Sequence, residues 1–154
     1  MLPRIRCSVR GFVSRRPFPF VTFFLRTPHI SKLVDALIDT GSPFTVLSTN
    51  DVLSTRLTIT TMQSGEIVSL AGFRFFNHPI RDVTMNFRTE SDELFKVNLP
   101  KIGSLIPTKV DQKDMKKIKY IPSIIGDDFL EEQKLALYFN PSARIVYLEI
   151  PQTQ

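Results

Sequence analysis

The sequence predicts an all-β protein with one or two short helices, folded as a single domain. A chain of 154 residues can bury most of its apolar surface in one core and has little left for a second. Thirteen Phe and many Val, Ile and Thr favour strands, because aromatic and β-branched side chains pack well on a pleated sheet. Eleven Pro help divide the chain into short apolar runs, which is typical of strands joined by turns.

The first part of the chain predicts an arm and a hairpin. Residues 1–16 have no clear period, so we expect a basic, irregular N-terminal arm with at most some strand pairing around residues 5–13. Residues 20–25 form an apolar run between prolines and predict a strand. Residues 32–38 predict the next strand, so that the two form a hairpin that delivers Asp39.

The middle of the chain predicts a short helix and then a strand meander. Residues 48–51 offer several N-cap side chains for a helix that runs to about Leu57. Gly65 and Gly72 are turn candidates within the meander. The expected strand segments after residue 47 lie within residues 58–76, 80–87 and 94–99.

The last third of the chain predicts mixed structure that ends in a hairpin. Residues 109–120 are rich in Lys and indicate a solvated loop or a short helix. Residues 123–126 return to a buried strand. Asp128 and Glu131 have the spacing of a capping box for the following helix, so this acidic cluster needs no metal. Two strands within residues 135–139 and 144–150 close the chain.

We place the chemistry at Asp39, which follows a β-rich apolar run. A carboxylate at the end of a buried strand is costly unless it is used or paired. Thr40 supplies a hydroxyl, and Gly41 lets the backbone turn tightly.

This segment resembles the active-site strand of the retropepsin-like aspartic proteases. Their pattern is an apolar pair, Asp-Thr-Gly, a small residue, two variable positions and Thr-Val-Leu, and it matches residues 37–47. Residues 124–126 are similar to the family's second element, an apolar pair before a Gly that opens the closing helix. Residues 68–73 are similar to the flap tip, with one Gly where retroviral enzymes have several.

The resemblance implies a fold and a domain organisation. The fold would be a retropepsin-like closed β-barrel or sandwich, equivalent to half of a pepsin, that assembles as a homodimer. The protease domain would cover residues 17–150, after the basic arm of residues 1–16 and before a C-terminal tail of residues 151–154.

The resemblance also implies an aspartic endopeptidase that hydrolyses protein or peptide substrates without a cofactor. Two carboxylates held roughly 3 Å apart share a proton, so that one activates water while the other polarises the scissile carbonyl. The sequence holds one Asp-Thr-Gly, so the second Asp39 would come from a second copy across a C2 axis.

The family pattern assigns roles to further residues. Thr40 would hydrogen-bond across the axis, and Gly41 would meet the substrate backbone. Ser42 would either hydrogen-bond the carboxylates or fill the place of a small residue. Leu70 would enter the cleft from the flap tip, with the backbone of Ala71 and Gly72 reaching the peptide. The candidates for apolar pocket walls, which suggest a bulky apolar substrate, are Ile38, Phe44, Leu70, Ile124 and Ile125.

The sequence also departs from the retroviral pattern. Retroviral enzymes carry an Asp just beyond the catalytic Gly and an Arg after the later Ile-Gly, and these two pair to brace the dimer. Pro43 and Asp127 stand at those positions here. The same brace therefore cannot form.

Two alternatives stay open. One is a catalytically inactive member of the same fold that binds extended peptides or assembles a complex through a sheet edge. The other is nucleic-acid binding through the arginine-rich amino terminus. Residues 1–34 hold seven basic and no acidic side chains, whereas the rest holds 13 basic and 15 acidic ones. The globular part is therefore not basic, which makes a nucleic-acid partner the weaker expectation.

Composition also bears on the compartment. Cys7 is the only cysteine, so no intrachain disulfide can form, which suits a reducing cytoplasm. No apolar run approaches the length of a membrane span. We therefore expect a soluble, cytoplasmic protein.

Overall fold

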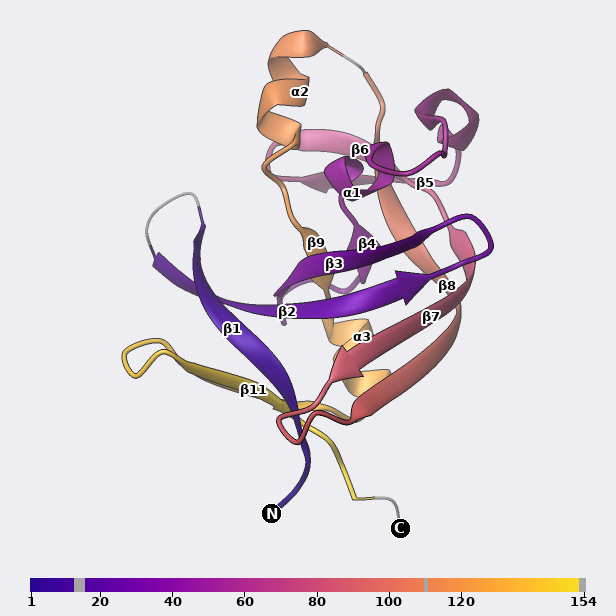
Figure 1. The fold of residues 1–154 in the computed structure, drawn as a ribbon. Helices are drawn as coiled ribbons and strands as arrows, with labels where there is room; N and C mark the ends of the chain where they lie inside the picture. Colours follow the sequence, from indigo (N-terminus) through magenta and orange to yellow (C-terminus); the bar gives the residue numbers. More distant parts are fainter. Residues whose placement is uncertain (13–15, 110, 153–154) are drawn as a thin grey trace.

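Strands make up most of this protein, as its composition predicts. A computed structural model describes residues 1–12, 16–109 and 111–152 (Figure 1). Strands account for 52% of the chain and helices for 14%, which confirms the all-β prediction. The elements in chain order are β1 (Arg4–Phe12), β2 (Arg16–Arg26), β3 (Ser31–Ile38), β4 (Val46–Leu47), α1 (Thr49–Leu53), the 3-10 helix η1 (Ile59–Met62), β5 (Glu66–Leu70), β6 (Phe73–Asn77), β7 (Ile80–Arg88), β8 (Leu94–Pro107), α2 (Gln112–Ile118), β9 (Ser123–Ile125), α3 (Asp127–Glu132), β10 (Ala136–Asn140) and β11 (Ile145–Glu149).

Six strands close into a barrel. Going round the barrel, β2 pairs with β3, β3 with β9, β9 with β4, β4 with β8, β8 with β7, and β7 with β2 again. All of these pairs are antiparallel except β3–β9 and β4–β8. Because the ring is closed, each of its six strands pairs with a neighbour on both sides.

The barrel interior and one of its ends are filled by apolar side chains. Phe87 of β7 lies 5.3 Å from Phe23 of β2 and 5.6 Å from Phe129 of α3, measured between ring centroids. All three side chains are at most 2% exposed. The α3 helix thus packs an aromatic ring into the core that the barrel strands surround, and this fixes the helix that follows β9.

Residues 4–12 of the expected irregular arm form β1, which corrects the sequence prediction, while residues 13–15 of that arm lie outside the described residues. Within residues 1–16, β1 pairs with β2 through six residue pairs and with β11 through three. Its side chains alternate: Ile5 is fully buried, whereas Arg4 and Arg6 on either side of it belong to the opposite face. The first and last strands, β1 and β11, lie side by side (Figure 1), and next to them the Ile150 N–H donates to the Pro3 carbonyl at 2.8 Å.

A second, smaller apolar cluster lies beyond the barrel. It joins β4, β6, β8 and β9 to α2 through buried side chains that include Phe75, Ile118 and Ile124. The β5–β6 hairpin adds Val68 and Leu70 to its margin. In Figure 1 this hairpin and α2 lie together at the top of the molecule. Residues 109–120, expected to be a loop or a short helix, therefore supply a packed helix at 112–118.

The helices begin and end for identifiable reasons. Ser48 is the N-cap of α1, because its hydroxyl accepts the Asp51 N–H at 3.0 Å, as predicted; the helix ends at Leu53 and not near Leu57. The N-cap of α3 is Gly126, which has no side chain to offer, so the expected capping box at Asp128 is wrong. No described helix is both long and apolar enough to cross a membrane.

Cys7 tests the packing of β1. Burial raises the pKa of its thiol to about 12, and its Sγ donates to the Ile5 carbonyl at 3.6 Å. At pH 8 the reactive thiolate is therefore scarce. We expect a thiol reagent to label the native protein at least about tenfold more slowly than the urea-unfolded chain. Equal labelling rates would contradict the packing of this strand.

Candidate active site

Asp39 lies in a tight turn directly after β3. The Asp39 N–H donates to the Ile125 carbonyl at 3.0 Å, and the Ser42 N–H donates to the Asp39 carbonyl at 3.1 Å. The Gly41 N–H donates to Asp39 Oδ1 at 3.0 Å. The Asp39 side chain is half-buried, whereas Thr40 and Gly41 are exposed. Among the described residues no basic side chain pairs with Asp39. The turn thus holds a carboxylate that is oriented by a backbone amide and has no counter-ion.

The short strand β9 lies between the two strands that flank this turn (Figure 1). It runs parallel to β3, with Leu37 opposite Ile124, and antiparallel to β4, with Val46 opposite the same residue. The apolar runs within 37–47 and 124–126 are far apart in the sequence, and the sheet brings them together. The geometry of the Asp39 turn is therefore set by a segment from the last third of the chain.

Gly126 lets the chain pass close to the turn as it leaves β9. A Cβ at this position would lie 2.7 Å from the Ser42 carbonyl oxygen and 2.7 Å from the Phe44 carbonyl carbon. Real Cβ atoms essentially never approach backbone this closely, so a side chain would force the turn to move. The Asp127 N–H then donates to the Ser42 carbonyl at 2.7 Å. Close backbone approach is the physical reason for glycine at this place.

Asp128 fixes the far end of the turn. Its Oδ1 accepts the Thr45 hydroxyl at 2.8 Å and its Oδ2 accepts the Thr45 N–H at 3.2 Å. Thr45 is 6% exposed, and its hydroxyl oxygen in turn accepts the Gly126 N–H at 3.0 Å. Pro43 and Asp127, which stand where the retroviral bracing pair would be, are both exposed. The Thr45–Asp128 contact was not predicted from the sequence, and no local pattern indicates it.

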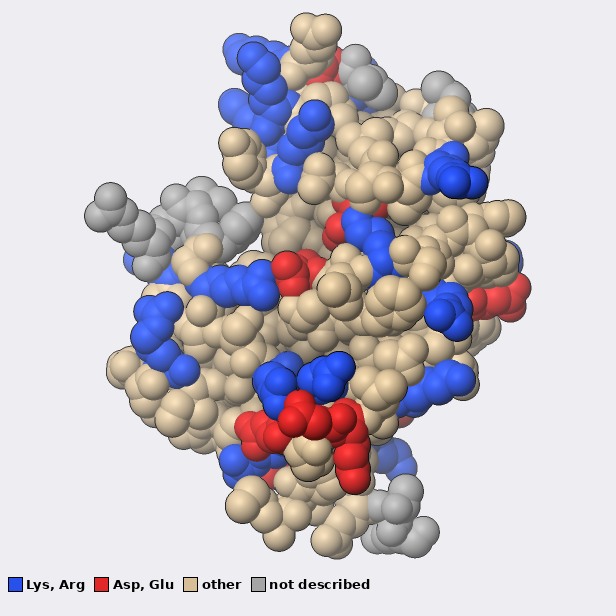
Figure 2. Space-filling view, viewed as in Figure 1, with Lys and Arg blue, Asp and Glu red and all other residues tan. Residues whose placement is uncertain are grey.

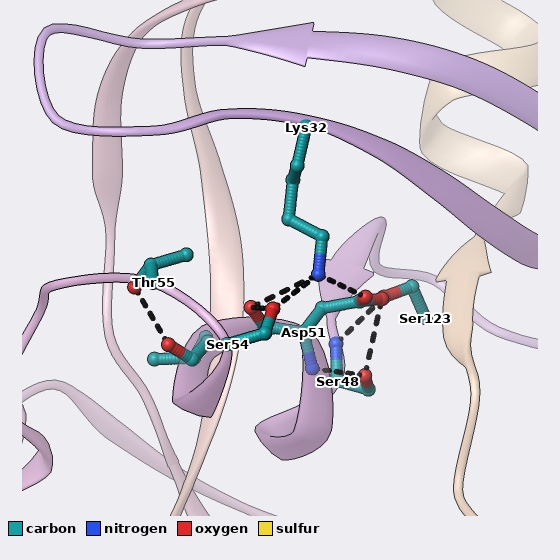
Figure 3. Close-up of polar contacts among 7 residues, drawn as sticks. Lys32, Ser48, Asp51, Ser54, Thr55 and Ser123 are labelled. Carbon is teal, nitrogen blue, oxygen red and sulfur yellow. Dashed lines mark hydrogen bonds and ion pairs between the residues drawn. The ribbon is translucent and has the colours of Figure 1, made fainter.

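A polar network joins β3, α1 and β9 (Figure 3). Lys32 Nζ on β3 lies 2.8 Å from Asp51 Oδ1, and Asp51 Oδ2 accepts the Ser123 hydroxyl at 2.5 Å. Ser123 Oγ accepts the Ser48 N–H at 2.8 Å. The Lys32 and Asp51 side chains are only 22% and 18% exposed. One carboxylate thus ties together β3, the start of α1 and β9, the strand that pairs beside the Asp39 turn.

The hydroxyls beside Asp39 have different environments. The Ser42 hydroxyl donates to the Phe44 carbonyl at 2.9 Å and accepts the Phe44 N–H at 3.3 Å. Both contacts lie within its own turn, and neither involves the Asp39 carboxylate. The exposed Thr40 makes no side-chain hydrogen bond within the described part of the chain.

The apolar residues assigned to pocket walls occupy three different places. Ile38 and Ile125 belong to the main core and are 3% and 0% exposed. Ile124 belongs to the second cluster. Phe44 is 41% exposed and lines a hollow of about 530 Å³ between α3, β8 and the base of the β5–β6 hairpin. In the single chain a ligand can therefore reach Phe44, whereas Ile38, Ile124 and Ile125 are covered.

The proposed flap is a β-hairpin with a two-residue turn. Leu70 pairs with Phe73, and Ala71 and Gly72 between them have φ values of 53° and 82°. Both tip residues are exposed, whereas Leu70 is half-buried against the cluster that contains Ile124. The backbone of the tip is therefore open to solvent, whereas the Leu70 side chain packs on the second apolar cluster beneath the hairpin.

Comparison with known proteins adds no assignment, since neither protein-family models nor curated proteins give a match to this chain. The described residues also contain no group of three His, Cys, Asp or Glu side chains placed to hold a metal ion.

The contact between Asp128 and Thr45 predicts a difference between two neighbouring acids. Asp128→Ala is expected to lower the free energy of unfolding by about 1–3 kcal/mol, because it leaves a buried hydroxyl and an N–H without their acceptor. Asp127→Ala removes an exposed carboxylate from the same helical turn and should change stability by less than about 0.5 kcal/mol. Urea unfolding measures both variants. Equal losses would contradict a specific role for Asp128.

The polar network predicts a larger effect for Asp51. Asp51→Ala leaves the mostly buried Lys32 ammonium without a counter-ion and removes the acceptor of the Ser123 hydroxyl. We expect a loss of about 2–4 kcal/mol in the free energy of unfolding. Glu131→Ala, at an exposed position on α3, is the control. A loss for Asp51→Ala no greater than that of the control would show that the network does not stabilise the fold.

Proposed function

We propose that this protein is a homodimeric aspartic endopeptidase of the retropepsin-like class, which hydrolyses peptide bonds with the Asp39 carboxylates of two subunits. The observation that carries the proposal is the Asp39 turn: a half-buried carboxylate at the end of a barrel strand, with no basic partner in the described part of the chain. Three segments resemble the family. Residues 37–47 contain this turn, residues 124–126 contain part of the strand that pairs beside it, and residues 68–73 contain an exposed hairpin tip.

The chemistry requires a second carboxylate. Water must lose a proton as it attacks the carbonyl carbon, and the departing nitrogen must gain one. With two facing carboxylates that share one proton, the ionised one takes the proton from water and the protonated one polarises the carbonyl oxygen. The tetrahedral intermediate then breaks at the C–N bond as a proton passes to the amine. One chain supplies half of this machinery.

A C2 dimer supplies the second half. The Asp39 turn is suited to a symmetry axis, because its outermost residues Thr40 and Gly41 are exposed in the single chain. The Thr40 hydroxyl would hydrogen-bond across the axis, by resemblance to the family. Substrate would lie between the paired turns and the β5–β6 hairpins, whose Ala71 and Gly72 backbone groups are open to a peptide.

The alternatives receive less support. An inactive peptide-binding relative would share the fold, but it would have no need of the Asp39 carboxylate in this turn. For nucleic-acid binding, two arginines of β1 are already engaged. Arg10 meets both carboxylate oxygens of Asp35, at 2.9 and 3.3 Å, and Arg4 stacks 3.9 Å over the Tyr147 ring. These contacts reduce the charge that the strand offers to phosphates.

Substitution of Asp39 tests the proposal. Asp39→Asn should leave fold and mass in solution unchanged and lower cleavage of an unfolded protein substrate by about 10²- to 10⁴-fold, because the base is lost. Assays from pH 3 to 7 with and without a pepstatin-type inhibitor, alongside solution mass, measure this. Glu131→Gln is the matched control, since it makes the same kind of change at an exposed carboxylate on α3 outside the turn.

Mixed dimers separate a shared site from two independent ones. Wild-type chain refolded with an excess of Asp39→Asn chain should lose activity per wild-type chain, because a mixed dimer holds a single carboxylate. Activity that stays proportional to the amount of wild-type chain would contradict the shared site. A folded dimer with no activity at any pH would favour the peptide-binding alternative.

A further inference from the structure

A groove on the outer face of the barrel arises where the sheet forks. β2 pairs with β1 up to Val21 and with β7 from Phe23, so its neighbour on that side changes between these residues. β1 then diverges towards β11, and the space between β1 and β7 is a groove of about 520 Å³. None of the residues assigned to the Asp39 site lines this groove.

The walls of the groove are held together at its end. The turn between β7 and β8 is attached to β1, because the Glu90 N–H donates to the Arg4 carbonyl at 2.9 Å and Ile5 forms a bridge with Thr89. A site whose two walls are joined by backbone contacts is preformed and loses little conformational freedom on binding.

The groove combines apolar and polar side chains. Leu33 and Leu94 line it and are 66% and 65% exposed, which is unusual for two leucines beside one groove. Phe24 lines it between them on β2. Ser8, Thr22 and Asn86 also line it and offer polar groups to the backbone of a ligand.

Every charged side chain that lines the groove is an arginine: Arg6, Arg10 and Arg88. Arg10 is occupied, because its guanidinium meets both oxygens of Asp35 at 2.9 and 3.3 Å, which lowers the pKa of that carboxyl. Arg6 and Arg88 share one carboxylate, at 2.9 and 3.7 Å from Asp92 Oδ1. Two guanidinium groups therefore face one anion.

Figure 2 shows where charged side chains gather on one face of the molecule. Acidic side chains gather at the lower centre of that view, at the place of the β7–β8 turn, with basic side chains directly against them. Asp92 itself does not line the groove and has a side chain that is 67% exposed. Exposed ion pairs of this kind are weak and exchange readily for another carboxylate.

We propose that this groove binds an extended peptide segment with an acidic side chain between apolar ones. The acidic side chain would take the donors of Arg6 and Arg88 that Asp92 does not use, while neighbouring apolar side chains cover Leu33 and Leu94. The two most exposed apolar side chains of the groove, Leu33 and Leu94, are aliphatic, which favours a peptide over single-stranded nucleic acid, whose bases stack on aromatic faces. This site goes beyond the proposed proteolysis and does not depend on it.

The test is direct binding to Asp39→Ala protein, which cannot cleave the probe under the proposed mechanism. The probe is a fluorescein-labelled ten-residue peptide with one Glu among Leu and Ser residues, and its partner carries Gln in place of that Glu. We expect fluorescence anisotropy to give at least about tenfold tighter binding for the Glu peptide. Added Arg6→Gln and Arg88→Gln substitutions should remove that difference, whereas Arg81→Gln, exposed on the same strand as Arg88, should keep it.

A variant that is expected to tighten binding serves as a second test, because a loss of fold could not produce tighter binding. Asp92 has a φ of 64°, a conformation that Asn tolerates, so Asp92→Asn removes the competing carboxylate and keeps the turn. It should tighten binding of the Glu peptide. Equal binding of the two peptides, binding unaffected by the arginine substitutions, or tighter binding of an oligothymidine of 20 nucleotides than of the Glu peptide would each overturn the proposal.

Discussion

The site depends on the insertion of β9 between β3 and β4. This strand of three residues pairs with both neighbours, and its Ile125 carbonyl accepts the N–H of Asp39. It can continue into α3 only because Gly126 lacks a side chain where the backbone passes the Asp39 turn. The barrel closes and the carboxylate is oriented through the same few residues, so stability and the proposed chemistry cannot be separated at this point.

Local patterns predicted what depends on neighbouring residues. The strands around residues 20–25 and 32–38, the Ser48 cap and the closing hairpin all follow from apolar runs, caps and turns. β1 was expected to be an irregular arm because its arginines dominate its composition. Its alternation of arginines with Ile5 and Cys7 is nevertheless the period of a half-buried strand, and it was the signal that could have identified it.

The site was predictable only in part, because the contacts that hold it join residues far apart in the sequence. The tripeptide at Asp39 and the Gly at 126 are visible as motifs, and the structure places them together. The contacts that hold them are not: Thr45 and Asp128 are 83 residues apart, and Ser48 and Ser123 are 75 apart. Ser, Thr and Asp are common at caps and turns, so their pairing across such separations appears only once the sheet has formed.

The order of the strands has a kinetic consequence. β3 and β4 are close in sequence. If they paired directly with each other as a hairpin, the two strand edges that pair with β9 would be occupied. In the native sheet β9 lies between them and comes from the last third of the chain, so closure requires a long loop to form. The two-residue length of β4 and the proline at 43 weaken the premature hairpin. Closure of the barrel by β9 therefore depends on contacts distant in sequence, which slow folding.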